Sequence, residues 1–122
     1  MAKILVADDA LFMRNSLKFI CEQAGHEVVG VAADGKEAIK LFEELKPDLV
    51  TLDILMKGMN GIEALKKLRE KDPQVKVIMV TAIGQGSMQK EAAHLGATAY
   101  IRKPFKAEDV VATINKALEE GE

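Results

Sequence analysis

Three aspartates in this 122-residue sequence could form one metal site, because each comes directly after a short apolar run. Asp8 and Asp9 follow residues 3–7, and Asp53 follows residues 49–52. Carboxylates a few ångströms apart repel one another, and some take up protons unless a cation joins them. Mg²⁺ prefers oxygen ligands and commonly uses one or two carboxylates together with a phosphate. If the three side chains meet, they predict a Mg²⁺ site in which one carboxylate can attack phosphorus and form an aspartyl phosphate.

Two further polar residues end later apolar runs. Thr81 follows residues 75–80, and Lys103 follows residues 99–102. A threonine hydroxyl can donate to a phosphoryl oxygen, and a lysine ammonium is a mobile positive charge that suits phosphate. Both residue types therefore agree with phosphoryl chemistry at the three aspartates.

Each of these residues has a plainer interpretation when taken alone. The pair Asp8-Asp9 could cap a helix, Asp53 could begin a loop, Thr81 could simply end a strand, and Lys103 could be a solvated surface lysine. Their joint position after four strands is what favours a single site. The aspartates that lack such convergence are interpreted as turn and cap residues: Asp34, Asp48, Asp72 and Asp109.

The elements that must position these residues alternate along the chain. Runs of strand length cover residues 3–7, 28–32, 49–52, 75–80 and 99–102. Helical periodicity covers residues 12–24, 38–45, 62–68, 87–95 and 110–118. This alternation predicts an α/β fold, a doubly wound parallel sheet of five strands with helices on both faces. Ligands of such sheets bind outside the carboxyl ends of the strands, which is where all the polar residues named above would meet.

Composition narrows the function classes. Lysine and arginine number 17 against 19 acidic residues, so the net charge of −2 offers no basic field for nucleic acid. No apolar run approaches the roughly 20 residues that a membrane span needs, and the N-terminus lacks the apolar region of a signal peptide. We expect one cytoplasmic domain over residues 1–122, with no nucleic-acid or membrane partner. Cys21 is interpreted as a small buried hydrophobe, and His26 and His94 as surface side chains.

The motifs around the polar residues resemble the receiver domain of two-component response regulators. They are Asp8-Asp9, residues 46–53, Met59-Asn60-Gly61, Thr81-Ala82 and Lys103-Pro104-Phe105. The resemblance covers essentially the whole chain and is nearest to the stand-alone chemotaxis type. It implies a flavodoxin-like (βα)5 fold with strand order 2-1-3-4-5.

The resemblance also implies roles at the acidic cluster. Asp53 would be the phosphoryl acceptor. Asp9 would bind Mg²⁺ directly, Asp8 would bind it mainly through water, and the backbone carbonyl of Leu55 would supply a further ligand. Lys57 departs from the pattern, because the family usually has proline at that position. The loop therefore lacks a rigid residue and gains a positive charge near the site.

Other roles are implied by the same resemblance. Thr81 and Lys103 would contact the phosphoryl group, and the Lys103-Pro104 bond would be cis. Tyr100 stands at the position of the family's switching aromatic residue, which turns inward when the threonine moves. Leu55 and Ile83 lie two positions after the acceptor and the threonine, and their bulk predicts slow self-dephosphorylation.

The implied function is that of a phosphorylation-activated response regulator and not of a turnover enzyme. A histidine kinase would supply the phosphoryl group, and a face around Tyr100 would bind a downstream protein such as the flagellar motor switch. A phosphorelay carrier is an alternative within the family. A small Mg²⁺-dependent aspartyl phosphatase is a rival class, but its members carry Asp-x-Asp after the first strand, whereas Asp8 and Asp9 are adjacent. A flavin-binding domain would need a hydroxyl-rich loop at that position.

Overall fold

The computed structural model describes residues 2–83 and 86–119. Within these ranges lies one sheet of five parallel strands in the order β2-β1-β3-β4-β5, as predicted. The strands are β1 (Lys3–Ala7), β2 (Glu27–Ala32), β3 (Leu49–Leu52), β4 (Lys76–Thr81) and β5 (Ala99–Arg102). The helices are α1 (Leu11–Gln23), α2 (Gly35–Leu45), α3 (Gly61–Lys71), α4 (Ser87–His94) and α5 (Ala107–Glu119).

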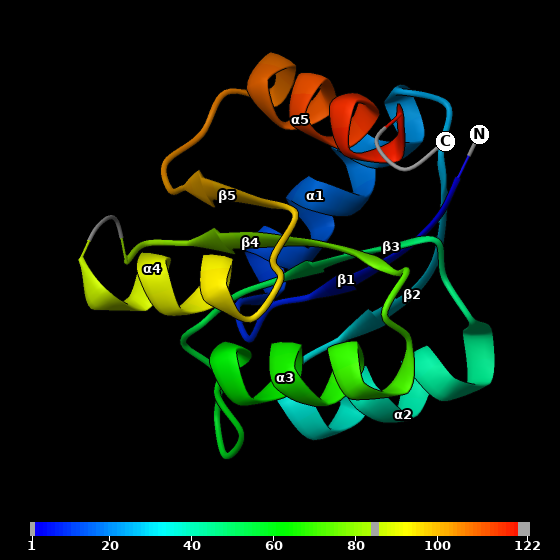
Figure 1. Ribbon diagram of the computed structural model, residues 1–122. Coiled ribbons are helices and arrows are strands. Elements are labelled where there is room, and N and C mark those ends of the chain that lie inside the picture. Colours follow the sequence, from blue (N-terminus) through cyan, green and yellow to red (C-terminus); the bar gives the residue numbers. More distant parts are fainter. Residues whose placement is uncertain (1, 84–85, 120–122) are drawn as a thin grey trace.

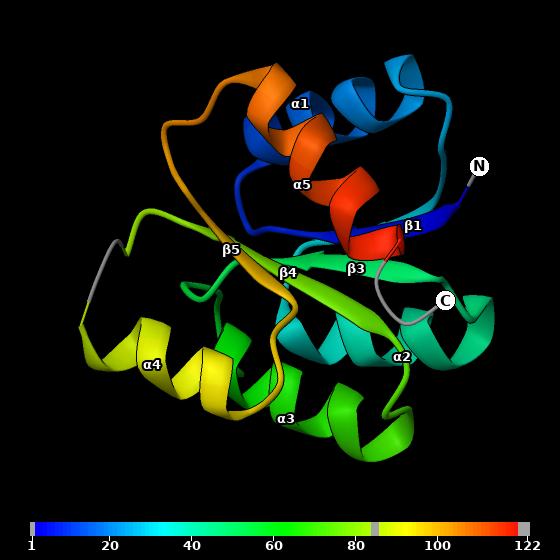
Figure 2. The ribbon, with the colours of Figure 1, turned by 45° about the horizontal axis from the view of Figure 1, so that its top comes forward.

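Helices cover both faces of this sheet. Helices α1 and α5 lie on one face, and α2, α3 and α4 lie on the other (Figure 1). Turning the molecule brings this face forward, where α1 packs on β1 and β2, α5 packs on β4 and β5, and the two helices lie side by side (Figure 2). The three-layer arrangement results from right-handed crossovers between parallel strands.

The alternation of side chains along β1 explains why the sheet needs both layers of helices. Ile4 and Val6 pack in the cluster formed with α1 and α5, whereas Leu5 and Ala7 pack in the cluster formed with α2, α3 and α4. All four side chains are essentially inaccessible to solvent. A strand that is buried on both faces is a nearly continuous apolar run, so the first charged side chain after that run marks the end of the strand.

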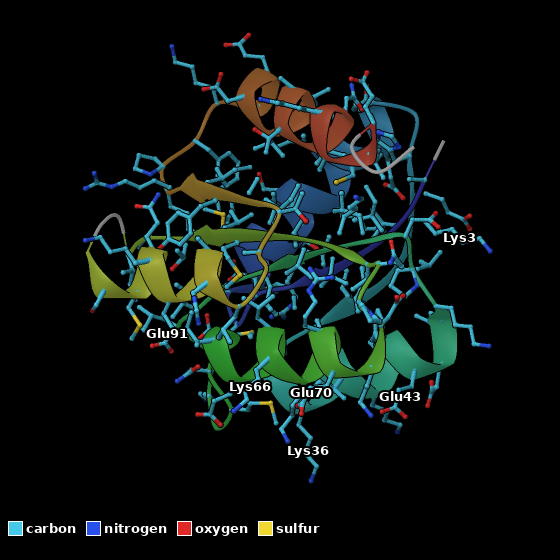
Figure 3. The ribbon with its side chains drawn as sticks, in the orientation of Figure 1. Lys3, Lys36, Glu43, Lys66, Glu70 and Glu91 are labelled. Carbon is cyan, nitrogen blue, oxygen red and sulfur yellow. The ribbon has the colours of Figure 1, made fainter. Side chains whose placement is uncertain are left out.

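Local capping sets where two of the helices begin. The side chain of Asp34 accepts the N–H of Glu37 at 2.8 Å, and Asn60 accepts the N–H of Glu63 at 3.0 Å. Both are N-caps that satisfy an otherwise unpaired helical donor. Charged side chains of α2 and α3, such as those of Lys36 and Glu70, extend away from the sheet (Figure 3).

Most expectations about individual residues are confirmed. Cys21 is fully buried, and His94 is exposed. Asp34 is a cap, Asp72 accepts the N–H of Gln74 in a turn, and Asp109 lies in the first turn of α5. In the described part of the chain, no helix is long and apolar enough to cross a membrane.

His26 lies at the surface, as expected, but its half-buried ring also forms two specific contacts. Its Nδ1 atom accepts the backbone N–H of Ala2 at 3.1 Å, and its Nε2 atom lies 3.0 Å from Oδ1 of Asn115. The half-buried ring therefore joins the segment before β1 to α5. Asp48 likewise does more than shape a turn, since its carboxylate accepts the N–H of Lys3 at 2.8 Å.

Candidate functional site

The site lies at the carboxyl edge of the sheet, where β1 and β3 end beside each other. Ala7 of β1 pairs with Leu52 of β3, so the next residues of the two strands are also neighbours. One ligand oxygen from each of Asp8, Asp9 and Asp53 lies within 4.8 Å of the others. The structure therefore brings together the three carboxylates that were predicted to form one cluster.

The three carboxylates differ in how they are held. Asp8 and Asp53 are only 1% and 5% exposed, whereas Asp9 is exposed to solvent. Oδ1 of Asp8 accepts the N–H of Ala10 at 2.9 Å, and Oδ1 of Asp53 accepts the N–H of Leu55 at 3.2 Å. The plainer interpretation as a helix cap is wrong, because Ala10 is the N-cap of α1 and no side chain caps that helix.

Lys103 completes the cluster from the end of β5. Its Nζ atom lies 2.6 Å from Oδ2 of Asp8 and 3.1 Å from Oδ2 of Asp53. Burial lowers the pKa of the ammonium, but the hydrogen bonds to the two carboxylates and their negative charges together outweigh burial and leave its pKa above the ordinary value. The Lys103-Pro104 peptide is cis, as predicted. The lysine thus bridges two buried carboxylates.

The electrostatics of the cluster favour a bound cation. Burial raises the pKa of Asp8 and the charge of Asp53 adds to this effect, although the hydrogen bonds from Lys103 and Ala10 oppose it. Three carboxylates and one ammonium carry two net negative charges when all four are ionised. Oxygen donors with that net charge are the ligand set that a hard divalent cation prefers. The residues present therefore fit a Mg²⁺ ion.

Thr81 and Tyr100 are connected through the backbone of Ile83. The fully buried hydroxyl of Thr81 accepts the N–H of Ile83 at 3.3 Å. The hydroxyl of Tyr100 donates to the carbonyl of the same residue, and its ring packs against the core cluster under α2, α3 and α4. Burial raises the pKa of Tyr100, and the charge of Asp53 adds to the effect, so the hydroxyl stays a donor.

The segment after Asp53 is held close to the acceptor by a glycine. The N–H of Gly61 donates to the carbonyl of Ile54 at 2.8 Å. A Cβ atom at this position would lie 2.1 Å from the carbonyl oxygen of Asp53, which is far inside van der Waals contact. Only glycine lets α3 begin this near to the acceptor. Leu55 and Lys57 lie on the same segment and are exposed.

One residue at the site was missed from the sequence. Nη1 of Arg14, on the first turns of α1, donates to the backbone carbonyl of Asp8 at 2.7 Å. Its spacing could have drawn attention to it, because it lies one helical turn after Ala10 and helical side chains lean toward the N-terminus. The bond joins α1 to the loop that carries the acidic pair.

Comparison with known proteins gives consistent matches. Residues 4–115 match the response regulator receiver domain family. The chemotaxis protein CheY of Thermotoga maritima is 48% identical over 114 residues, which cover 93% of this chain and 95% of that protein. The chemotaxis protein CheY of Bacillus subtilis is 47% identical over 116 residues, which cover 95% of this chain and 97% of that protein.

Solved structures agree with the sequence comparison. A chain in the crystal structure of the CheX-CheY-BeF3-Mg+2 complex from Borrelia burgdorferi superposes with a TM-score of 0.93 at 32% identity, covering 97% of this chain and 90% of that one. A CheY-like receiver domain protein from Methanospirillum hungatei gives a TM-score of 0.93 at 33% identity, covering 98% and 95%. The flavodoxin-like fold expected from the sequence is confirmed.

Proposed function

Because this chain belongs to the response regulator receiver domain family, we propose that it is a phosphorylation-activated switch in which Asp53 accepts the phosphoryl group. The observation that carries the proposal is the environment of the Asp53 carboxylate, which is buried beside other carboxylates and a lysine. Asp53 is 5% exposed, with an oxygen of each of the other two carboxylates within 4.8 Å and Lys103 Nζ at 3.1 Å. A carboxylate is a competent nucleophile for phosphorus when a cation offsets the charge of the incoming group.

Four groups would hold the Mg²⁺ ion. They are the carboxylates of Asp8, Asp9 and Asp53 and the backbone carbonyl of Leu55. When bound, the ion would supply a Lewis acid that neutralises phosphoryl oxygens. The exposed carboxylate of Asp9 leaves one side of the cluster open for water and for the phosphoryl donor.

The chemical step needs few protein groups. A carboxylate oxygen of Asp53 attacks the phosphorus of a phosphohistidine on a histidine kinase. The new O–P bond forms as the P–N bond breaks, and the departing imidazole takes a proton from solvent. Lys103 leaves its bridging position between Asp8 and Asp53 to pair with the phosphoryl oxygens, and Thr81 donates its hydroxyl to another of them.

The conformational change would be transmitted from Thr81 to Tyr100. When the Thr81 hydroxyl turns to the phosphoryl group, it releases the N–H of Ile83, whose carbonyl holds the Tyr100 hydroxyl. Moving a two-state equilibrium from 1:99 to 99:1 takes roughly 5.5 kcal/mol, and each hydrogen bond to a charged group contributes about 1.5–3 kcal/mol. The free energy of two or three new phosphoryl contacts is therefore sufficient to shift this equilibrium.

The partners belong to the same proposal. A histidine kinase donates the phosphoryl group, and the face formed by α4, β5 and α5 around Tyr100 binds a downstream protein such as the flagellar motor switch. The chemotaxis names of several relatives support this output over that of a phosphorelay carrier. We propose further that residues 1–122 act as one receiver domain in the cytoplasm.

Intact-protein mass spectrometry after incubation with acetyl phosphate tests the proposal. The wild type and Asp53→Asn are each incubated with Mg²⁺ and with a chelator instead. We expect the mass of one phosphoryl group to be gained only by the wild type and only with Mg²⁺. No gain by a folded wild type would overturn the proposal. Release of many equivalents of phosphate per chain would favour the rival class of aspartyl phosphatases.

A further inference from the structure

The acidic pair is tied to α1 by the half-buried side chain of Arg14. Its backbone N–H donates to the carbonyl of Ala10 at 3.0 Å, as in any helix, while its guanidinium reaches past the helix start to the carbonyl of Asp8 at 2.7 Å. Ala10 has no side chain that could cap α1. The guanidinium therefore adds a second side-chain bond between this helix end and the loop, beside the one from the N–H of Ala10 to Oδ1 of Asp8.

The position of the Asp9 carboxylate depends more on the local backbone than do the positions of the other two carboxylates. Asp8 and Asp53 are each held by Lys103 and by a backbone N–H. Among residues 2–83 and 86–119, no hydrogen bond reaches the carboxylate of Asp9, which is exposed. Where this carboxylate lies is thus set mainly by the orientation of the peptide that precedes it.

That peptide is the one held by Arg14. The carbonyl of Asp8 and the N–H of Asp9 belong to one planar peptide unit, so a hydrogen bond that fixes the carbonyl also fixes where the Asp9 backbone begins. Because the donor is a guanidinium cation, this bond is charge-assisted.

We propose that Arg14 is a positioning residue that pre-orients Asp9 for Mg²⁺. The inference rests on the proposed function, since it needs the acidic cluster to bind the ion. Without Arg14, the Asp8-Asp9 peptide would sample other orientations, and cation binding would have to order it. Loss of a group that orients a metal ligand typically weakens metal affinity by about 10- to 100-fold.

Isothermal titration calorimetry with MgCl₂ on the full chain tests this inference. Arg14→Met removes the donor and keeps much of the side-chain volume, whereas Arg14→Lys keeps one cationic donor. Lys18→Met, at an exposed position of the same helix, is the matched control. We expect Mg²⁺ binding to weaken about 10-fold in Arg14→Met. We expect a smaller loss in Arg14→Lys and none in Lys18→Met.

A second readout separates positioning from a general loss of structure. In Arg14→Met, the Mg²⁺ concentration that gives half-maximal phosphorylation by acetyl phosphate should rise by the same factor, and the rate at saturating Mg²⁺ should return to that of the wild type. Unchanged Mg²⁺ affinity in folded Arg14→Met would overturn the inference, as would a lower Tm without an affinity change. Absence of Mg²⁺ binding by the wild type would instead overturn the proposed function.

Discussion

Lys103 has a defined position before any phosphoryl group arrives. Its side chain is 14% exposed and its ammonium lies between the carboxylates of Asp8 and Asp53, so part of the charge repulsion in the cluster is already offset. Breaking a buried ion pair by removing one partner costs several kcal/mol, because the other charge is left unpaired. The lysine therefore stabilises the resting site and is also within reach of the acceptor.

Two apolar residues next to this site bear on how long the phosphoryl group would last. Leu55 is 56% exposed, and its backbone N–H donates to the Asp53 carboxylate. Ile83 is half-buried, and its backbone N–H donates to the Thr81 hydroxyl. Neither side chain has a polar group that could orient an attacking water. Slow self-dephosphorylation therefore stays a prediction.

Leu55→Asn and Ile83→Gln should each speed dephosphorylation by about fivefold, since one added hydrogen bond is worth about 1 kcal/mol. The reason is that an amide can hold water in line with the O–P bond. The measurement is the decay of the phosphorylated mass after acetyl phosphate is removed. Leu55→Met is the control and should decay like the wild type. Equal decay in all four proteins would refute the explanation.

The element that carries the acceptor is short, and its geometry depends on the start of α3. Strand β3 ends at Leu52, and the chain returns to begin α3 at Gly61, whose N–H bonds to Ile54. The cap of α3 by Asn60 fixes the direction of that return. The position of Asp53 is therefore set by the beginning of the next helix as well as by its own strand.

Gly61→Ala should lower the free energy of unfolding by about 1–3 kcal/mol, the usual range for overpacking. The added methyl group would collide with the carbonyl of Asp53, so phosphorylation by acetyl phosphate should slow as well. Urea unfolding and the mass assay measure the two effects. Gly25→Ala is the control, because it has open space around its Cβ and a strained φ of +89° far from the site. A control variant that lost as much phosphorylation would contradict this account.

Across the whole molecule, the acidic cluster and the face around Tyr100 belong to different parts of the sheet. The cluster lies at the ends of β1 and β3, while Tyr100 lies on the edge strand β5 beside β4. They are connected through Lys103, which pairs with two carboxylates of the cluster and whose backbone N–H donates to the carbonyl of Thr81 at 2.8 Å. Thr81 and the tyrosine hydroxyl are in turn both bonded to Ile83. A change at one end of this chain of contacts must alter the packing at the other if the protein is a switch.

Tyr100 should report this coupling directly, because the protein contains one tyrosine and no tryptophan. We expect acetyl phosphate with Mg²⁺ to change the tyrosine emission of the wild type, since the hydrogen bond to Ile83 is altered. Asp53→Asn and Thr81→Val should show no change. Constant emission in a fully phosphorylated wild type would refute the proposed coupling.

Tyr100→Ala should still be phosphorylated but should bind the downstream protein more weakly.

Local patterns were sufficient to predict the strands, the order of elements and the residues at the strand ends. Strand β3, for example, is Leu49–Leu52 in both the prediction and the structure. Strands buried on both faces are nearly continuous apolar runs, and a carboxylate is far less suited to such a run than the threonine of β3, so Asp8 and Asp53 mark strand ends without any tertiary information. The positions of residues that directly follow a strand were therefore predictable from the sequence. The predicted convergence of the three aspartates is confirmed.

Long-range side-chain contacts were decided only by the tertiary structure. Arg69 is one such residue, since its guanidinium donates to the carbonyls of Val75 and Gly96, which belong to two different loops. His26 is another, because its partners, the backbone N–H of Ala2 and Oδ1 of Asn115, lie in distant segments that no sequence motif identifies. A backbone carbonyl is the same in every residue, so which one a side chain reaches depends on how the finished fold brings distant segments together.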